Sequence, residues 1–305
     1  MTPVWTVVAL PVALGVLTLL AASGNAVLGA AASGAPAPLR HWDDPLRAAA
    51  RALVQQRRRT FAADRLLSRV GVVTLPVAAL LAAVVLPLGT RAVADWSVGV
   101  VWFNAMEVAT WAAVWLTGWG PNSAYALVGG YRYLAQGLAY ELPHMFALIT
   151  VALGAGSLNV TRVADAQDGL WFGVWMPVAF AVYLVSALAM AFWGPLAHPV
   201  ADDVASGAAV ELDGPDRLVF AVGRYALLVV AAAAAVPFFL GGGAGPWLPA
   251  PVWTLVKTLV VLGALLWAGH RLPVLRMDRF LEFAWIVLIP ASLLQMLVVA
   301  LVVLD

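Results

Sequence analysis

Long apolar stretches separated by short polar segments dominate the sequence. A membrane-spanning helix needs about 20 predominantly apolar residues, and eight stretches of the chain come close to that length. The pattern therefore predicts an all-α, polytopic integral membrane protein that forms a single membrane domain over residues 1–305. The expected spans are residues 4–22, 71–89, 97–118, 124–154, 171–193, 217–240, 252–268 and 282–304.

One segment between the first two spans has a different pattern. Residues 43–56 read DDPLRAAARALVQQ, with arginines on one helical face and apolar side chains on the other. Asp43 or Asp44 can cap such a helix, and Pro45 suits its first turn. We expect an amphipathic helix that lies along the membrane surface. An ordinary connecting helix would show a similar pattern.

The composition agrees with a membrane location. Hydrophobic residues make up 63% of the chain and charged residues only 11%, whereas soluble domains carry about 25% charged residues. A net charge of +1 gives no electrostatic reason to expect a nucleic-acid partner. With no cysteine and four scattered histidines, we expect the chain to bind no metal ion or iron–sulfur cluster. Redox chemistry, if any, is expected on partner proteins or on a diffusible cofactor.

Arginine distribution predicts the orientation. Cytoplasmic loops of membrane proteins are enriched in Lys and Arg, and arginines gather in segments 23–70 and 269–281, each of which follows an odd-numbered span. We expect these segments in the cytoplasm, which puts both termini outside in an eight-span protein of the bacterial inner (plasma) membrane. The arginines concerned are Arg40, Arg47, Arg51, Arg57, Arg58, Arg59, Arg65, Arg69, Arg271, Arg276 and Arg279.

Several ionisable residues fall inside the predicted spans or at the entrance of the last one. An ionisable side chain at the bilayer centre costs about 2.5–3.5 kcal/mol on insertion scales, so each is a functional candidate. Glu141 follows Arg132 by nine residues, which places the two on nearly opposite faces of one helix. His144 is expected to be a structural histidine. The full set is Glu107, Arg132, Glu141, Arg224, Lys257, Asp278 and Glu282.

The most specific segment is GWGPNSAYALVGGYRYLAQGLAYELPHMFALITVALGAGSLNV, residues 118–160. It resembles the core signature of the family of NADH-quinone oxidoreductase H subunits, which belong to respiratory complex I. The resemblance continues through the surface helix, through ADRLLSRVGVVTLPVAALLAAVVLPLG (63–89), through the acidic loop 201–215 and through residues 256–290. It implies an all-α fold with eight spans and one surface helix.

The resemblance also implies a function. A family member is the membrane subunit that links the peripheral electron-transfer arm of a proton-translocating NADH:quinone oxidoreductase to its membrane arm. It forms part of the tunnel that admits quinone, the substrate, and it begins the proton path. The implied partners are the iron–sulfur and quinone-module peripheral subunits, the neighbouring membrane subunits and the lipid bilayer. Such a chain is a non-autonomous subunit without a complete active site.

Eight residues become site candidates. Glu141 matches the intramembrane glutamate of the family, and burial among apolar helices suits a carboxyl that binds and releases protons. Lys257 is interpreted as a charge partner. For Asp203 and Glu211, the alternative is a solvated acidic loop without a role at the quinone. For Arg276 and Asp278, the alternative is an interfacial anchor that docks the peripheral arm. The proton-path candidates are Glu141, Arg132, Lys257 and Glu107, and the quinone-proximal candidates are Asp203, Glu211, Arg276 and Asp278.

The sequence also departs from the family pattern, as expected of a divergent member. Gln55-Gln56 replace a Lys-Glu pair, Trp193 and Ala197 replace an arginine and an aspartate, and Arg224 stands where the family has a glutamate. Two other functions therefore stay open. One is a membrane anchor of a group 4 hydrogenase or formate-hydrogenlyase-like complex, and the other is a stand-alone transporter.

Overall fold

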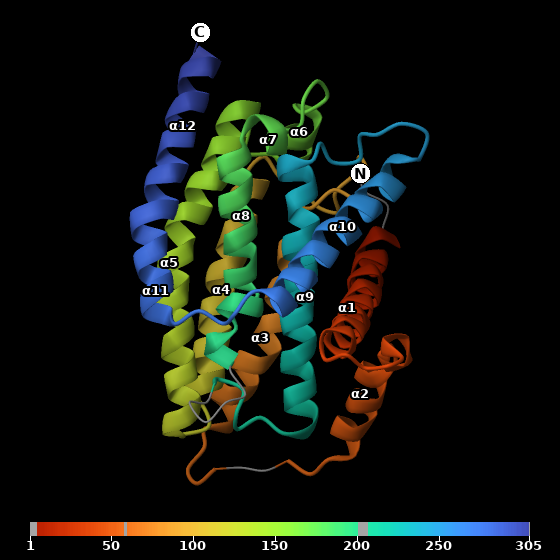
Figure 1. Ribbon diagram of the computed structural model, residues 1–305, viewed down its shortest axis with the longest axis vertical. Helices are drawn as coiled ribbons and strands as arrows, with labels where there is room; N and C mark the ends of the chain where they lie inside the picture. Colours follow the sequence, from red (N-terminus) through yellow and green to blue (C-terminus); the bar gives the residue numbers. More distant parts are fainter. Residues whose placement is uncertain (1–4, 58–59, 201–206, 305) are drawn as a thin grey trace.

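The computed structural model describes residues 5–57, 60–200 and 207–304. Within these residues the chain folds into helices joined by loops and has no β-strand (Figure 1). The longer helices are α1 (Trp5–Ala32), α2 (Asp44–Val54), α3 (Arg65–Ala83), α4 (Gly99–Trp119), α5 (Ala124–Ala155), α8 (Pro177–Met190), α9 (Gly214–Phe239), α10 (Ala250–Arg271) and α12 (Ile289–Leu304). The short ones are η1 (Pro38–His41), α6 (Val160–Asp165), α7 (Phe172–Trp175), η2 (Gly194–Leu196), η3 (His198–Val200), α11 (Met277–Phe283) and the π-helical η4 (Ala284–Leu288).

The membrane fold predicted from the sequence is confirmed. In the described part of the chain, seven helices are long and apolar enough to cross a membrane, and the shorter α8 is also apolar. Six of the seven are α1, α3, α4, α5, α9 and α10, and the seventh is the continuous run from α11 through η4 to α12.

Two spans differ from their predicted form. The predicted span 171–193 is divided into α7 and the 14-residue α8. The break falls before Pro177, which has no backbone N–H and suits the first turn of a new helix. The last span begins at Met277, earlier than predicted, and contains the π-helical turn η4. Apolar periodicity does not reveal this π-helical turn because the residues around it are almost all apolar, so no polar face marks the change in helical phase.

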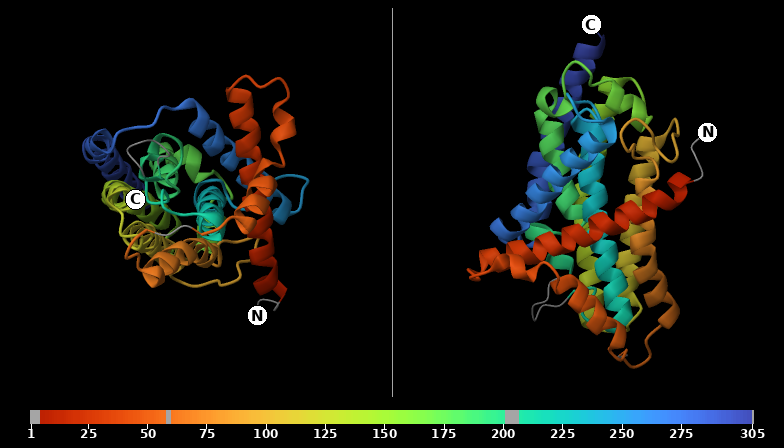
Figure 2. Two further views of the ribbon diagram at one scale, coloured as in Figure 1. Left: turned by 90° about the horizontal axis from the view of Figure 1, so that it is seen from below. Right: turned by 90° about the vertical axis from the view of Figure 1, so that its right-hand side faces the viewer.

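Helix α9 occupies the centre of the bundle. It is the most buried of the candidate spans and packs against α1, α3, α8 and α10, while α5 packs against α4, α8 and α12. Figure 2 shows α1 crossing the outside of the bundle at a steep angle, with α2 beside its end. The chain thus forms a compact group around α9, with α1 and α2 applied to one side.

Close contact between neighbouring helices depends on small residues. A Cβ atom on Gly71 of α3 would lie 2.6 Å from the backbone nitrogen of Thr117 in α4. A Cβ atom on Gly118 of α4 would lie 2.6 Å from the carbonyl oxygen of Ala126 in α5. Glycine allows helix backbones to approach closely in membranes, where van der Waals packing drives association. These contacts hold α3, α4 and α5 together.

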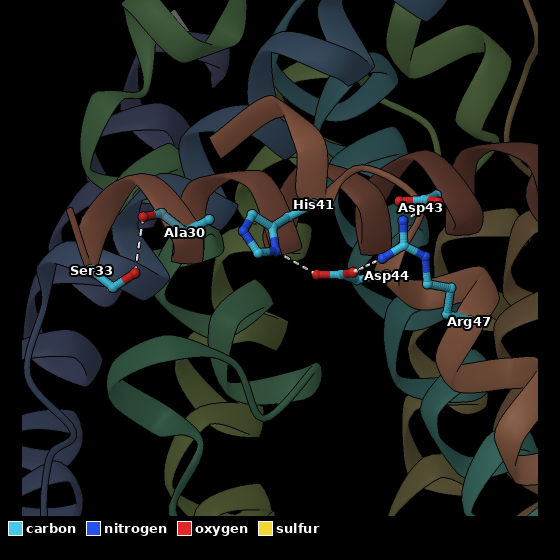
Figure 3. A network of polar contacts seen from close by, with 6 residues as sticks. All are labelled: Ala30, Ser33, His41, Asp43, Asp44 and Arg47. Carbon is cyan, nitrogen blue, oxygen red and sulfur yellow. Dashed lines mark hydrogen bonds and ion pairs between the residues drawn. The ribbon is translucent and has the colours of Figure 1, made fainter. Parts of the chain in front are cut away.

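Helix α2 is the amphipathic surface helix that the sequence predicts. No residue of this fully described helix is buried, and Pro45 lies in its first turn. Asp43 occupies the N-cap position, but its carboxylate makes no capping bond. It accepts a hydrogen bond from Arg47 Nη2 at 2.7 Å instead, and Asp44 Oδ2 lies 2.7 Å from His41 Nδ1 (Figure 3). Asp43 and Asp44 therefore fix the start of the helix through side-chain contacts.

The first helix starts and the last helix finishes toward the same end of the bundle. Helix α1 begins and α12 ends toward the upper end in Figure 1, whereas α2 and the start of α9 lie toward the lower end. An even number of crossings requires this arrangement of the termini. The predicted orientation with both termini outside agrees with it and stays a prediction.

Candidate functional site

A cluster of four polar side chains lies between α4 and α5, three of them buried and Asn104 partly buried. Asn104 Nδ2 donates a hydrogen bond to Glu141 Oε1 at 2.9 Å. His144 Nε2 lies 2.9 Å from Glu107 Oε1. Glu107, Glu141 and His144 are 2%, 9% and 1% exposed. Two acidic groups and one histidine thus share a part of the bundle from which solvent is almost excluded.

Helical spacing explains how the cluster forms. Asn104 and Glu107 are three residues apart on α4, and Glu141 and His144 are three residues apart on α5, so each pair lies on one face. The two helices run in opposite directions because only a short loop joins them. The Asn104–Glu141 and Glu107–His144 contacts therefore cross between the helices and bring all four side chains together.

Aromatic rings enclose the histidine. The ring centroid of His144 lies 5.3 Å from that of Tyr183 in α8 and 6.4 Å from that of Tyr140 in α5. Phe103 of α4 is 6.5 Å away. Tyr183 is held in place because its hydroxyl donates to the carbonyl of Ala231 at 2.7 Å. Packed rings thus shield the His144 side of the cluster from lipid and water.

Several polar atoms of the cluster keep unused hydrogen-bonding capacity. Asn104 Oδ1, Glu107 Oε2, Glu141 Oε2 and His144 Nδ1 are buried and have no hydrogen-bond partner among the described residues. A buried polar atom left unpaired costs about 1–3 kcal/mol, and such atoms in native proteins call for an explanation such as a catalytic role. The cluster is therefore a candidate functional site.

A cavity of about 870 Å³ lies between α1, α2 and α9. Most of its lining is apolar or small, including Leu19 and Ala22 of α1, Ala49 of α2, and Ala221 and Val222 of α9. A few polar groups interrupt this lining: Thr18, Asn25, Asp44, Arg51, Gln55, Arg217 and Tyr225. An apolar cavity with a few placed polar groups is typical of a site for a small amphiphilic molecule.

Polar side chains from three helices meet at one wall of the cavity. Asn25 Nδ2 of α1 donates to the hydroxyl of Tyr225 in α9 at 3.0 Å. Asn25 Oδ1 lies 2.8 Å from His270 Nε2 of α10. Asn25 and Tyr225 line the cavity, so the network connects it with the C-terminal turn of α10.

Next to Tyr225, the arginine that departs from the family pattern is surrounded by aromatic rings. Arg224 Nη2 donates to the carbonyl of Phe192 at 2.7 Å, and its Cζ atom lies 4.6 Å from the centre of the Trp193 ring. The Trp193 ring meets Tyr225 edge-on with centroids 5.1 Å apart. A guanidinium over an aromatic face is stabilised by the ring quadrupole. Trp193 and Arg224 both depart from the family pattern and lie far apart in the sequence, but their side chains contact each other.

The same aromatic contacts continue toward the buried cluster. Phe192 meets Tyr133 of α5 edge-on, with ring centroids 5.2 Å apart. Tyr133 and Tyr140 lie two turns apart on one face of α5, and Tyr140 contacts His144. An unbroken series of packed side chains thus runs from Tyr225 at the cavity to His144.

The remaining intramembrane candidates lie in different places. Lys257 of α10 is 6% exposed, and its ammonium donates to the carbonyls of Leu240, Gly242 and Ala244 at 2.6, 3.0 and 2.8 Å. In the described structure it therefore fixes the loop after α9. Arg132 is half-buried on α5, nine residues before Glu141. Their membership of a proton path stays a prediction.

The quinone-proximal candidates lie in the loop before α9, at the start of α11, or outside the described residues. Glu211 Oε1 accepts a hydrogen bond from Ser123 at 2.7 Å and lines a small polar cavity of about 60 Å³ together with Arg57, Arg65 and Arg69. Arg276 and Asp278 form an exposed ion pair at 3.1 Å. Asp203 lies outside the described residues. The structure does not bring Glu211 together with Arg276 and Asp278.

Comparison with known proteins gives a consistent result. The family model for NADH dehydrogenase matches residues 39–300. The chain is 39% identical over 207 residues to NADH-quinone oxidoreductase H subunit 1 of Geobacter metallireducens, which is 68% of this chain and 63% of the relative. It is equally similar to H subunit 2 of Geobacter sulfurreducens. The matched segment thus spans less than two thirds of these relatives.

A third relative is covered more completely. The NADH-quinone oxidoreductase H subunit of Syntrophotalea carbinolica is 33% identical over 249 residues, which is 78% of this chain and 76% of the relative. The matched part of the chain includes the helices that carry the buried cluster, because the family model spans α4 and α5.

Proposed function

The chain belongs to the NADH dehydrogenase family, and on that premise we propose that it is the membrane subunit of a complex-I-like NADH-quinone oxidoreductase. In this role it connects the peripheral electron-transfer arm to the membrane arm, admits quinone and begins the proton path. The observation that carries the proposal is the cavity between α1, α2 and α9.

The chemistry of the cavity suits a quinone. A quinone has an apolar tail and a ring with two carbonyl oxygens that accept hydrogen bonds. The cavity offers apolar and small side chains for the tail, and Asn25, Tyr225 and Arg51 for the ring oxygens. Helix α2 lies on the outside of the bundle, and residues along its length form one wall of the cavity. A lipid-soluble molecule can therefore enter from the membrane between α1 and α2.

The aromatic contacts from Tyr225 to His144 support a link between quinone and proton chemistry. Electron transfer to a quinone adds negative charge, and charges in a low-dielectric interior act over longer distances than in water. Glu107 and Glu141, buried in the cluster, are proposed as the first proton carriers. Lys257 and Arg132 are proposed as fixed charges elsewhere on the same path.

The lower end of the bundle is proposed as the docking face for the peripheral arm. It carries Glu211 with the arginines around its small cavity. The exposed pair of Arg276 and Asp278 lies higher, at the start of α11, and is proposed as a second contact of the same partner. Asp203, outside the described residues, belongs to the same acidic loop as Glu211. These charged side chains can pair with complementary charges on a water-soluble partner.

A bulky side chain in the cavity provides the test. Ala49 of α2 lines the cavity, and Ala49→Trp places an indole in the path proposed for quinone. We expect the KM for quinone to rise about 10-fold, because the ligand loses contacts worth about 1.4 kcal/mol. The measurement is the quinone dependence of electron transfer by the purified complex.

The matched control is the next residue along the same helix. Ala50 is exposed and does not line the cavity, so Ala50→Trp should leave the KM for quinone unchanged. Equal effects of the two substitutions would argue against the cavity as the quinone site. Electron transfer that needs no quinone, with a nickel-containing partner instead, would favour a hydrogenase anchor.

A further inference from the structure

The closest contact in the buried cluster involves Glu107 and His144, neither of which the family resemblance calls for. We propose that Glu107 and His144 hold one exchangeable proton between them and relay it to and from Glu141. The inference rests on the proposed function, because it adds a step to that proton path. It assigns a proton-carrying role to the imidazole of His144.

Burial is the first argument. Glu107 and His144 are 2% and 1% exposed, and an unpaired charge in such a place is strongly unfavourable. A carboxylate beside an imidazolium and a carboxylic acid beside a neutral imidazole both have zero net charge. A proton can therefore move within the pair without leaving an isolated charge, and the pair tolerates either arrangement.

The contact geometry is the second argument. His144 Nε2 and Glu107 Oε1 are 2.9 Å apart, within reach of direct proton transfer, although the contact is not a well-aligned hydrogen bond. Catalytic hydrogen bonds are often poorly aligned at rest and tighten during turnover. Glu107 Oε2 and His144 Nδ1 have no hydrogen-bond partner among the described residues. A purely structural pair would use these atoms to hold the helices together.

The position of Glu141 completes the relay. Glu141 is one turn from His144 on the same face of α5, and its charge interacts with both members of the pair. Among the described residues, the other titratable groups close to the pair are the phenols of Tyr133 and Tyr140 on α5 and of Tyr183 on α8. The imidazole of His144 thus lies next to both carboxyl groups of the cluster, those of Glu107 and Glu141.

The proton balance of the step is simple. Before the step Glu141 is a carboxylic acid, His144 is neutral with its proton on Nε2, and Glu107 is a carboxylate, so the cluster carries one negative charge throughout. The O–H bond of the Glu141 carboxylic acid breaks, and an N–H bond forms at His144 Nδ1, directly or through one water molecule. The proton on His144 Nε2 then passes to Glu107 Oε1. Glu141 ends as a carboxylate, His144 ends neutral with its proton on the other nitrogen, and Glu107 ends protonated. The reverse sequence resets the cluster.

The test uses the assembled complex reconstituted in lipid vesicles, with Glu107→Gln, His144→Gln and the double variant. Both substitutions keep hydrogen-bonding side chains but cannot carry the proton. We expect each to lower the rate of proton translocation about 100-fold, the lower range for a positioned acid–base group. The double variant should be no slower than either single variant, because both residues serve one proton.

The control is Thr150→Val, which removes a buried hydroxyl one and a half turns further along α5 that donates to the carbonyl of Phe146 at 2.7 Å. It should leave proton translocation unchanged. The relay would be overturned if the double variant were slower than either single variant by the product of their two fold-decreases. It would also be overturned if His144→Gln translocated protons at the normal rate.

A second measurement separates the relay from the proposed function and does not depend on any variant. Infrared difference spectra of the wild-type complex with isotope-labelled histidine are recorded on a change of bulk pH, without substrate. We expect a carboxyl band and an imidazole band that change together. The absence of coupled bands would overturn the relay even in a complex that reduces quinone. Coupled bands in a complex that does not reduce quinone would support the relay and contradict the proposed function.

Discussion

Replacing Glu141 by glutamine is expected to lower proton translocation by the assembled complex about 100-fold or more. Glutamine fills the same volume and can still bind Asn104, which donates to Glu141 Oε1 at 2.9 Å, but it cannot bind and release a proton. The complex should therefore assemble in normal amounts. The measurement is the number of protons moved per electron in reconstituted vesicles.

An exposed carboxylate on another span gives the control for this variant. Glu282 lies near the start of the last span, and its side chain is 58% exposed and pairs with Arg279 at 3.6 Å. Glu282→Gln should translocate protons normally. Normal coupling in the Glu141 variant would remove Glu141 from the proton path.

The second large effect is expected for Trp193. Trp193→Ala should lower the free energy of unfolding by about 3–5 kcal/mol, the usual range for truncating a large buried aromatic residue. The ring is 5% exposed and contacts both Arg224 and Tyr225. Its removal leaves a cavity and takes one aromatic face from a half-buried guanidinium. The measurement is the apparent melting temperature of the purified chain or complex in detergent.

Two further substitutions identify the source of this effect. Trp193→Phe keeps an aromatic face beside Arg224 and should lower the melting temperature much less. Trp247→Ala removes a fully exposed indole in the loop before α10 and should have no effect. A large loss in the phenylalanine variant would mean that packing volume, and not the cation–π contact, holds this region.

The sequence was a good guide to the helices because length and hydropathy are local properties. Seven predicted spans correspond to helices whose ends lie within about ten residues of the predicted ones. The division at Pro177 and the π-helical η4 were not predicted. Both are changes in backbone hydrogen bonding inside an apolar run, and hydropathy does not record where such bonds are lost or shifted.

The candidate site was predictable only in part. Burial in a span singled out Glu107 and Glu141 individually, but His144 was expected to be structural. What places His144 beside Glu107 is the packing of α4 on α5, a tertiary contact. The three-residue spacing within Asn104–Glu107 and within Glu141–His144 was a usable signal, because it puts polar side chains on single faces of two adjacent antiparallel helices.

Departures from the family pattern are easier to understand in space than in sequence. A tryptophan in place of an arginine and an arginine in place of a glutamate read as two unrelated losses of function. In the structure Arg224 lies against Trp193, so an aromatic face now stabilises the guanidinium. The cavity between α1, α2 and α9 was likewise beyond sequence reasoning, since its lining comes from segments far apart in the chain.

Photolabelling tests directly whether quinone occupies the cavity between α1, α2 and α9, on which the proposed function depends. The purified complex is illuminated with a quinone that carries a photoreactive group, and the labelled peptides are sequenced. We predict label on cavity-lining residues such as Leu19, Ala49 or Ala221, and loss of that label when excess natural quinone is added. The contradicting result is label found only on other helices or on other proteins of the complex, where natural quinone displaces it, and no label on α1, α2 or α9.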